Sequence, residues 1–161
     1  MMCLSTWAGA GQTVYQKPSE FLAGAFGGTV PATKALRLSS SHQDRIKRLL
    51  GHAYRPSTVR YWRKGDTMAV ILDEIGKVEP ITTGIVVKGG RIDRVKILIY
   101  RESHGMEVAR TSFTKQFRMA GLKPDGRLNR RVDGISGATL SVRAVTGLAR
   151  VVLYLDRVAP K

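Results

Sequence analysis

Two strand-like segments joined by a glycine pair constrain the fold of this chain most strongly. Residues 81–87 and 92–100 are rich in Val, Ile and Thr, and the sequence Lys88-Gly89-Gly90-Arg91 lies between them. β-Branched side chains favour strands, and glycines provide the positive φ angles that tight hairpin turns need. The pattern therefore predicts an antiparallel hairpin in the middle of the chain.

Alternation within residues 92–100 predicts which side chains of the second strand are buried. Apolar residues recur at odd positions, whereas cations occupy two of the even positions. Since successive side chains of a strand point to opposite faces, we expect one set to face the core and the other to face water. The core-facing set is Val95, Ile97 and Ile99, and the water-facing set is Ile92, Arg94, Lys96, Leu98 and Tyr100.

The rest of the chain predicts helices and a second hairpin. Apolar residues recur with helical spacing through residues 140–156, directly after Thr139. The other expected elements are helices at 19–26, 41–50 and 112–119, and strands at 58–62 and 67–73. We predict an α+β fold, an antiparallel sheet packed by helices in a single domain, with residues 1–57 as an N-terminal extension carrying two short helices and residues 58–161 as the main domain.

The charge of the chain raises a nucleic-acid-binding alternative. Its 161 residues carry a formal net charge of +15, and such an excess is typical of many proteins that bind nucleic acids or anionic surfaces. However, the cations are scattered, and no helix-turn-helix, zinc-ligand or RNA-stacking motif accompanies them. The alternative function is therefore a basic protein that binds nucleic acid or an anionic surface without a cofactor.

Other site classes have little support in the sequence. Cys3 is the only cysteine, so an intramolecular disulfide or a Cys-rich metal site cannot form within one chain. His42, His52 and His104 are far apart and lie in no metal-ligand pattern. Charged residues interrupt every apolar run after Lys17, so we expect no bilayer-spanning segment there.

The segment Asp133-Gly134-Ile135-Ser136-Gly137-Ala138-Thr139 carries the strongest functional signal. It places a threonine hydroxyl at the expected start of the long helix, behind two small residues. The free N–H groups of a helix N-terminus attract phosphate, so Thr139 is a candidate acceptor for a phosphate-bearing group. In the alternative interpretation, Ser, Thr and Asp here only cap the helix.

Two sequence segments resemble the FMN-binding domain family, which includes the domain of the C subunit of the sodium-translocating NADH:quinone reductase and of the G subunit of the Rnf complex. Ser136 to Thr139 match the S-G-A-T flavin-attachment signature, and Asp133 lies at the position of its acidic residue. Glu102 and Gly105 match the family's E-T-P-G-L-G loop, in which His104 replaces the proline. Tyr100 to Val108 match the Y-R-E-S-x-G-x-E-V pattern of stand-alone, exported members.

The resemblance implies an electron-transfer flavoprotein domain with FMN as its cofactor. A separate flavin transferase would join FMN through its phosphate to Thr139, using FAD as donor and releasing AMP. The implied cofactor-binding residues form two groups, and neither the resemblance nor the residues imply a catalytic residue or a metal ligand. The attachment group is Asp133, Ser136, Gly137, Ala138 and Thr139, and the group beside the flavin ring is Glu102, Ser103, His104 and Gly105.

The resemblance also implies where the protein is located and which partners it has. Residues 1–10 are largely apolar or small and end in Ala8-Gly9-Ala10, which has the form of a signal-peptidase site, so they form a candidate signal-peptide remnant. Because the family's flavin transferase works outside the cytoplasmic membrane, we expect a periplasmic, exported protein associated with a membrane redox system. Its expected partners are the transferase, a membrane or soluble redox protein, and an anionic membrane surface. We expect a redox carrier rather than an autonomous enzyme.

Overall fold

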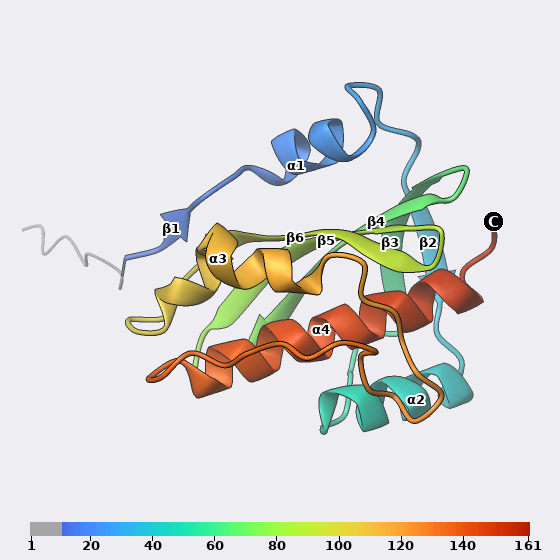
Figure 1. The fold of residues 1–161 in the computed structure, drawn as a ribbon. Coiled ribbons are helices and arrows are strands. Elements are labelled where there is room, and N and C mark those ends of the chain that lie inside the picture. The colour runs from blue at the N-terminus through green and yellow to red at the C-terminus, as the bar shows by residue number, and fades with distance from the viewer. Residues whose placement is uncertain (1–10) are drawn as a thin grey trace, which may run out of the picture.

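The structure is a computed structural model that describes residues 11–161. The predicted signal-peptide remnant at 1–10 lies outside the described residues. Six strands form one antiparallel sheet in the order β1-β6-β5-β4-β3-β2, and helices pack on both faces (Figure 1). The predicted α+β fold is thereby confirmed. The strands are β1 Thr13–Val14, β2 Lys34–Arg37, β3 Thr58–Lys64, β4 Thr67–Ile75, β5 Pro80–Lys88 and β6 Arg91–Tyr100.

Both predicted hairpins are present. β5 and β6 turn through Gly89 and Gly90, whose φ angles are 58° and 77°, and β3 and β4 turn at Gly65, whose φ is 60°. The β4–β5 pairing continues from Thr67 to Ile75 without a register shift. Since β5 runs opposite to β6, the turn between β4 and β5 lies at the same end of the sheet as the end of β6.

Helices cover the two faces of the sheet unequally. α4, residues Thr139–Val158, crosses one face together with α2, residues Ser40–Leu50, while α1, residues Pro18–Ala25, lies on the other face (Figure 1). α3, Thr111–Thr114, is flanked by short 3-10 turns and lies beside β6. No helix in residues 11–161 combines the length and the apolar composition that crossing a bilayer requires.

Each face has its own apolar core. The larger core lies between the sheet and α2 and α4, and buries the predicted apolar stripe of α4, including Val145, Leu148 and Val152. The smaller core lies under α1 and consists of Phe21, Leu22, Ala69, Val86 and Leu98. Burial on both faces makes the sheet a central layer between helices.

The alternation of side chains along β6 differs from the prediction because the strand contains two β-bulges. The pairing register with β5 shifts by one residue at Asp93 and again at Leu98. A bulge inserts one extra residue and so changes the face on which the following side chains lie. Ile92 and Tyr100 consequently belong to the larger core, and Leu98 faces α1. The prediction that these three side chains face water is wrong, because a strict period of two does not anticipate bulges.

The remaining predictions for β6 hold in part. Val95 and Ile97 are buried in the larger core as predicted. Ile99 instead is partly buried and packs against the smaller core on the side of α1. Arg94 is exposed as predicted, and Lys96 is half-buried.

The residues before β3 contribute to both edges of the sheet. β1 pairs with β6, α1 crosses the face opposite α4, and β2 pairs with β3 at the other edge. We call residues 13–37 the N-terminal strap. α2 then packs against α4 on the opposite face. Both segments thus lie against the expected main domain, and the division at residue 57 remains a prediction.

We predict that Gly84→Ala lowers the free energy of unfolding by about 1–3 kcal/mol, as overpacking does in other cores. A Cβ atom at Gly84 would lie 2.6 Å from the ring of Phe21, which packs on β5 at this position. The ring cannot move away without disturbing the contact of α1 with the sheet. Urea denaturation followed by circular dichroism measures the change.

Gly134→Ala is the matched control, because no heavy atom lies within 4 Å of a Cβ atom at that position. Its effect should stay within about 0.5 kcal/mol, as for most surface substitutions. Equal stability of the Gly84→Ala protein and the wild type would show that the strap does not pack closely on β5.

Candidate functional site

A cavity of about 300 Å³ opens where α4 begins. Three segments form it: the turn between β4 and β5, the loop after β6, and the residues at the start of α4. The lining residues are Lys77, Glu102, His104, Gly105, Gly137, Ala138, Thr139, Leu140 and Ser141. Two of the sequence motifs, which are more than 30 residues apart in the chain, therefore meet in one place.

The start of α4 leaves backbone donors free at this cavity. Ala138 is the N-cap residue and makes no side-chain capping hydrogen bond, while the N–H of Val142 donates to the carbonyl of Ala138 at 2.9 Å. The N–H groups of the three residues between them have no acceptor within the helix. The capping interpretation of this segment is therefore wrong, because no side chain caps α4.

The Thr139 hydroxyl is accessible. Thr139 is exposed and lines the cavity, and its hydroxyl has no hydrogen-bond partner among residues 11–161. Gly137 precedes it with a φ of 81°, which a residue with a side chain rarely adopts. Backbone conformation and not lack of space favours glycine here, because a Cβ atom at residue 137 would meet no heavy atom within 4 Å.

A buried hydrogen-bond chain joins the loop after β6 to the first turn of α4. The hydroxyl of Tyr100 donates to the carbonyl of His104, and burial raises its pKa, so it remains protonated. Its single proton is thereby used. The Ser141 hydroxyl, 2.8 Å away, must therefore be the donor to Tyr100. This chain fixes the distance between the two matched segments.

Gly105 allows the loop after β6 to lie close to the first turn of α4. A Cβ atom at this position would lie 2.8 Å from both the Ser141 and the Tyr100 hydroxyl oxygens. Its φ of 83° is also unfavourable for other residues. The loop can consequently approach the start of α4 only because residue 105 has no side chain.

Glu102 stabilises the turn that carries Lys77. Its Oε1 atom accepts hydrogen bonds from the N–H groups of Lys77, of Val78 at 2.7 Å and of Glu79 at 3.0 Å. Burial by itself would raise the pKa of Glu102, but these three donors stabilise the carboxylate and hold the pKa below its usual value. The carboxylate thereby holds the β4–β5 turn against the loop after β6.

The sequence interpretation missed three lining residues: Lys77, Leu140 and Ser141. Lys77 could have been found from topology alone. In two successive hairpins the β4–β5 turn must lie at the end of the sheet where β6 ends, and therefore beside the residues after Tyr100. Ser141 carries no comparable signal, because its role depends on the pairing with Tyr100.

Three candidate residues lie outside the cavity lining. Ser103 and Ser136 are exposed on the adjoining loops. Asp133 is exposed and forms an ion pair with Arg131 at 3.2 Å. Its backbone N–H also donates to the side chain of Gln116 at 2.8 Å, which fastens the loop before α4 to the segment after α3.

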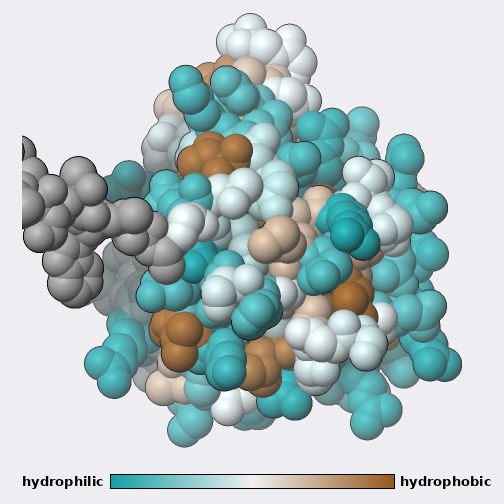
Figure 2. Space-filling view, turned by 90° about the vertical axis from the view of Figure 1, so that its left-hand side faces the viewer, coloured by the Kyte–Doolittle hydropathy of each residue, from teal (hydrophilic) through white to brown (hydrophobic). Residues whose placement is uncertain are grey.

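Exposed apolar side chains lie in the segments that form the cavity. Figure 2 views the end of the molecule where α4 begins, and shows separate hydrophobic side chains on a mostly hydrophilic face. Those of the cavity segments are Ile75, Val78, Met106 and Leu140, of which Val78 is 69% exposed. Single exposed apolar side chains are common on protein surfaces, so these four do not by themselves mark a ligand-binding surface.

Within residues 11–161, no group of three or more His, Cys, Asp or Glu side chains is placed so that it could hold a metal ion. The cavity instead combines free backbone N–H groups, the Lys77 amine, the His104 ring and the Thr139 hydroxyl. Such a set of donors suits an anion, and phosphate is the common ligand of such a helix start.

Residues 76–153 match the model of a family described as FMN-binding domain. The chain thus carries an FMN-binding domain, and the matched range contains every residue that lines the cavity. A search of curated proteins found no match to the chain.

We predict that Glu102→Gln lowers the free energy of unfolding by about 1–2 kcal/mol at pH 7, since hydrogen bonds to charged acceptors are stronger than those to neutral ones. Because the folded-state pKa is depressed, the stabilisation is complete above the usual glutamate pKa of about 4.3 and is lost as the pH falls through the folded-state value. Urea denaturation of both proteins between pH 7 and pH 3 should show the difference shrinking with acidification.

Glu20→Gln provides the control, because Glu20 is exposed on α1, where water solvates its carboxylate. Its effect on stability should be small and nearly independent of pH. A Glu102→Gln difference that stayed constant down to pH 3 would contradict the role of the carboxylate charge.

Proposed function

We propose that this FMN-binding domain carries FMN esterified through its phosphate to Thr139, and that it acts as an electron carrier rather than as an autonomous enzyme. The observation that carries the proposal is the junction of the two matched segments at one cavity, with the accessible Thr139 hydroxyl beside free helix N–H groups. FMN supplies the capacity to accept and release one or two electrons.

The residues present fit the phosphate of FMN. An ester at Thr139 would place its negatively charged phosphate within reach of the first turn of α4, whose partial positive charge stabilises anions. Lys77 and His104 line the same cavity and add donors. The Glu102 carboxylate also lines the cavity, and three backbone N–H groups that donate to its Oε1 atom offset part of its negative charge.

Attachment requires a second protein. In the proposed reaction the Thr139 oxygen forms a bond to the phosphorus of the FMN half of FAD, and the bond from that phosphorus to the AMP oxygen breaks. The hydroxyl proton passes to a base of the transferase, and AMP leaves. A threonine hydroxyl is unreactive at neutral pH, and phosphoryl transfer normally needs a divalent metal, so Thr139 is a substrate of the transferase.

The flavin ring is proposed to lie against the loop after β6. Gly105 permits close approach, and Ser103 and His104 offer polar groups on this loop. The exposed apolar side chains Val78 and Leu140 offer surface to the flat aromatic ring. In this arrangement the protein around the ring sets its reduction potential.

The proposed setting is outside the cytoplasmic membrane, where the flavin transferase of this family works. The proposed redox partner is a membrane or soluble electron-transfer protein. The net charge of +15 favours association with acidic partners or anionic lipid, because long-range attraction accelerates such encounters at low salt.

We predict that Thr139→Val abolishes covalent flavin attachment. After co-expression with a flavin transferase, the wild-type protein should give a fluorescent band on a denaturing gel and a mass increased by one FMN less one water. Thr139→Ser retains a hydroxyl and should retain the band. Thr111→Val removes another exposed threonine hydroxyl and should leave the band unchanged.

A fluorescent band in the Thr139→Val protein would place the ester elsewhere and contradict the proposal. Flavin that copurifies with the native wild-type protein but separates from it in the denaturing gel would instead indicate non-covalent binding. Wild-type protein without flavin in either assay would favour the alternative of a basic surface-binding protein.

A further inference from the structure

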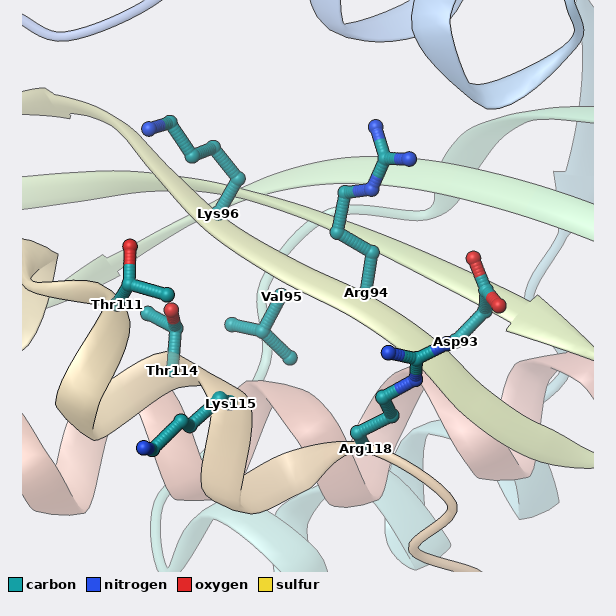
Figure 3. A pocket seen from close by; sticks show the side chains of 8 residues that line it. All are labelled: Asp93, Arg94, Val95, Lys96, Thr111, Thr114, Lys115 and Arg118. Carbon is teal, nitrogen blue, oxygen red and sulfur yellow. The ribbon is translucent and has the colours of Figure 1, made fainter.

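A second cavity, of about 330 Å³, lies along the outer edge of β6, beside α3. Its lining comes from two segments only, the strand and the helical region after Arg110. Figure 3 shows Arg94 and Lys96 projecting from β6 toward the side of α1, with Val95 and the residues of α3 on the opposite side. The lining residues are Asp93, Arg94, Val95, Lys96, Thr111, Thr114, Lys115 and Arg118.

The backbone of β6 is open along this cavity. At one end the carbonyl of Leu98 accepts the N–H of Tyr15 at 2.8 Å, and β1 pairs with the two residues that follow. At the other end the N–H of Ile92 donates to the carbonyl of Ala120 at 2.9 Å. Among the residues that the structure describes, none pairs through its backbone with this side of β6 between residues 93 and 97.

The open edge has the length of a short strand. Five residues at a rise of about 3.3 Å span roughly 16 Å, and alternate N–H and C=O groups of such a segment point away from β5. β1 already occupies the same edge further along, so a strand beside residues 93–97 would continue its line. Unpaired strand edges readily accept an extended chain.

The charges around the open edge of β6 indicate which kind of extended chain would bind there. Four cations line the cavity, Arg94, Lys96, Lys115 and Arg118, against the single carboxylate of Asp93. No ion pair involves any of the four within residues 11–161, and residues 1–10 contain no Asp or Glu. The cavity therefore has an excess of three positive charges.

The cations are spread along the strand instead of converging on one point. Arg94 and Lys96 are two residues apart on one side of β6, which separates them by about 7 Å along the strand, and Lys115 and Arg118 lie on the segment after α3. A single phosphate could not contact all four. An extended chain with several carboxylates could do so, with its side chains directed to both faces of the sheet.

We propose that the open edge of β6 binds an extended, acidic segment of a partner protein, which adds to the sheet as a further strand next to β1. Backbone hydrogen bonds to residues 93–97 hold the segment, and the four cations select acidic side chains. The site lies apart from the cavity at the start of α4 and does not depend on FMN.

The test uses the full chain and a fluorescein-labelled heptapeptide in which Glu alternates with Thr. Fluorescence anisotropy should report binding, and hydrogen exchange should show slower exchange of amides within residues 93–97 when the peptide is present. The same peptide with N-methyl groups at alternate residues lacks the donors needed for strand pairing. It should bind at least about tenfold more weakly, which corresponds to about 1.4 kcal/mol.

Charge selection is tested with paired substitutions. Lys115→Glu with Arg118→Glu should weaken binding of the peptide at least about tenfold. Lys34→Glu with Lys88→Glu makes the same change in net charge at exposed cations of other strands, and should change binding less than about threefold, since salt screens distant charges. Circular dichroism verifies that both double variants are folded.

Three outcomes would overturn the proposal. Equal binding of the N-methylated peptide, or unchanged exchange at residues 93–97, would exclude strand addition. Equal weakening by the two double variants would reduce the effect to net charge. Absence of peptide binding, together with phosphatidylglycerol vesicles that bind the wild type but not the Lys115→Glu, Arg118→Glu protein, would assign the cations to a lipid surface.

Discussion

The contact of α4 with the sheet is the constraint on which the rest of the structure depends. Polar contacts join the two ends of this helix to two different strands of the sheet. Its 20 residues extend about 30 Å, which is long enough to cross the sheet. Near its end, Asp156 accepts from the buried Arg63 of β3 at 3.0 Å. Near its start, Ser141 bonds to Tyr100 of β6. The apolar stripe between these two polar contacts supplies the burial that holds the helix in place.

Hydrogen bonds and close packing also hold together the segments that form the candidate site. The loop after β6 and the β4–β5 turn are irregular, yet Tyr100, Gly105 and Glu102 tie both to the first turn of α4. These three residues act in different ways, since Tyr100 bridges two segments, Gly105 permits their close approach and Glu102 accepts backbone hydrogen bonds. Thr139 itself makes no such contact, which leaves its hydroxyl available at a site that its neighbours hold in position.

The sequence predicted the parts of the structure that depend on local pattern. The two hairpins follow from β-branched runs around glycines, and α4 follows from the spacing of its apolar residues. The faces of β6 were mispredicted, because the bulges at Asp93 and Leu98 arise from pairing with β5 and from packing against α1. Similarly, the sequence pointed to the loop after β6 and the start of α4 by their residue types, whereas the place of Lys77 beside them follows only from strand order.

The N-terminal strap has a consequence for how the molecule is made. Val14 pairs with Ile99, so a segment near the beginning of the chain has no partner until most of the chain has been synthesised. Phe21 of the strap packs on Gly84 of β5, so this contact also joins residues that are far apart in the sequence. Contacts between residues this distant in sequence slow folding. One edge of the sheet therefore stays unpaired until Ile99 and Tyr100 have been made, and β1 can cover that edge only afterwards.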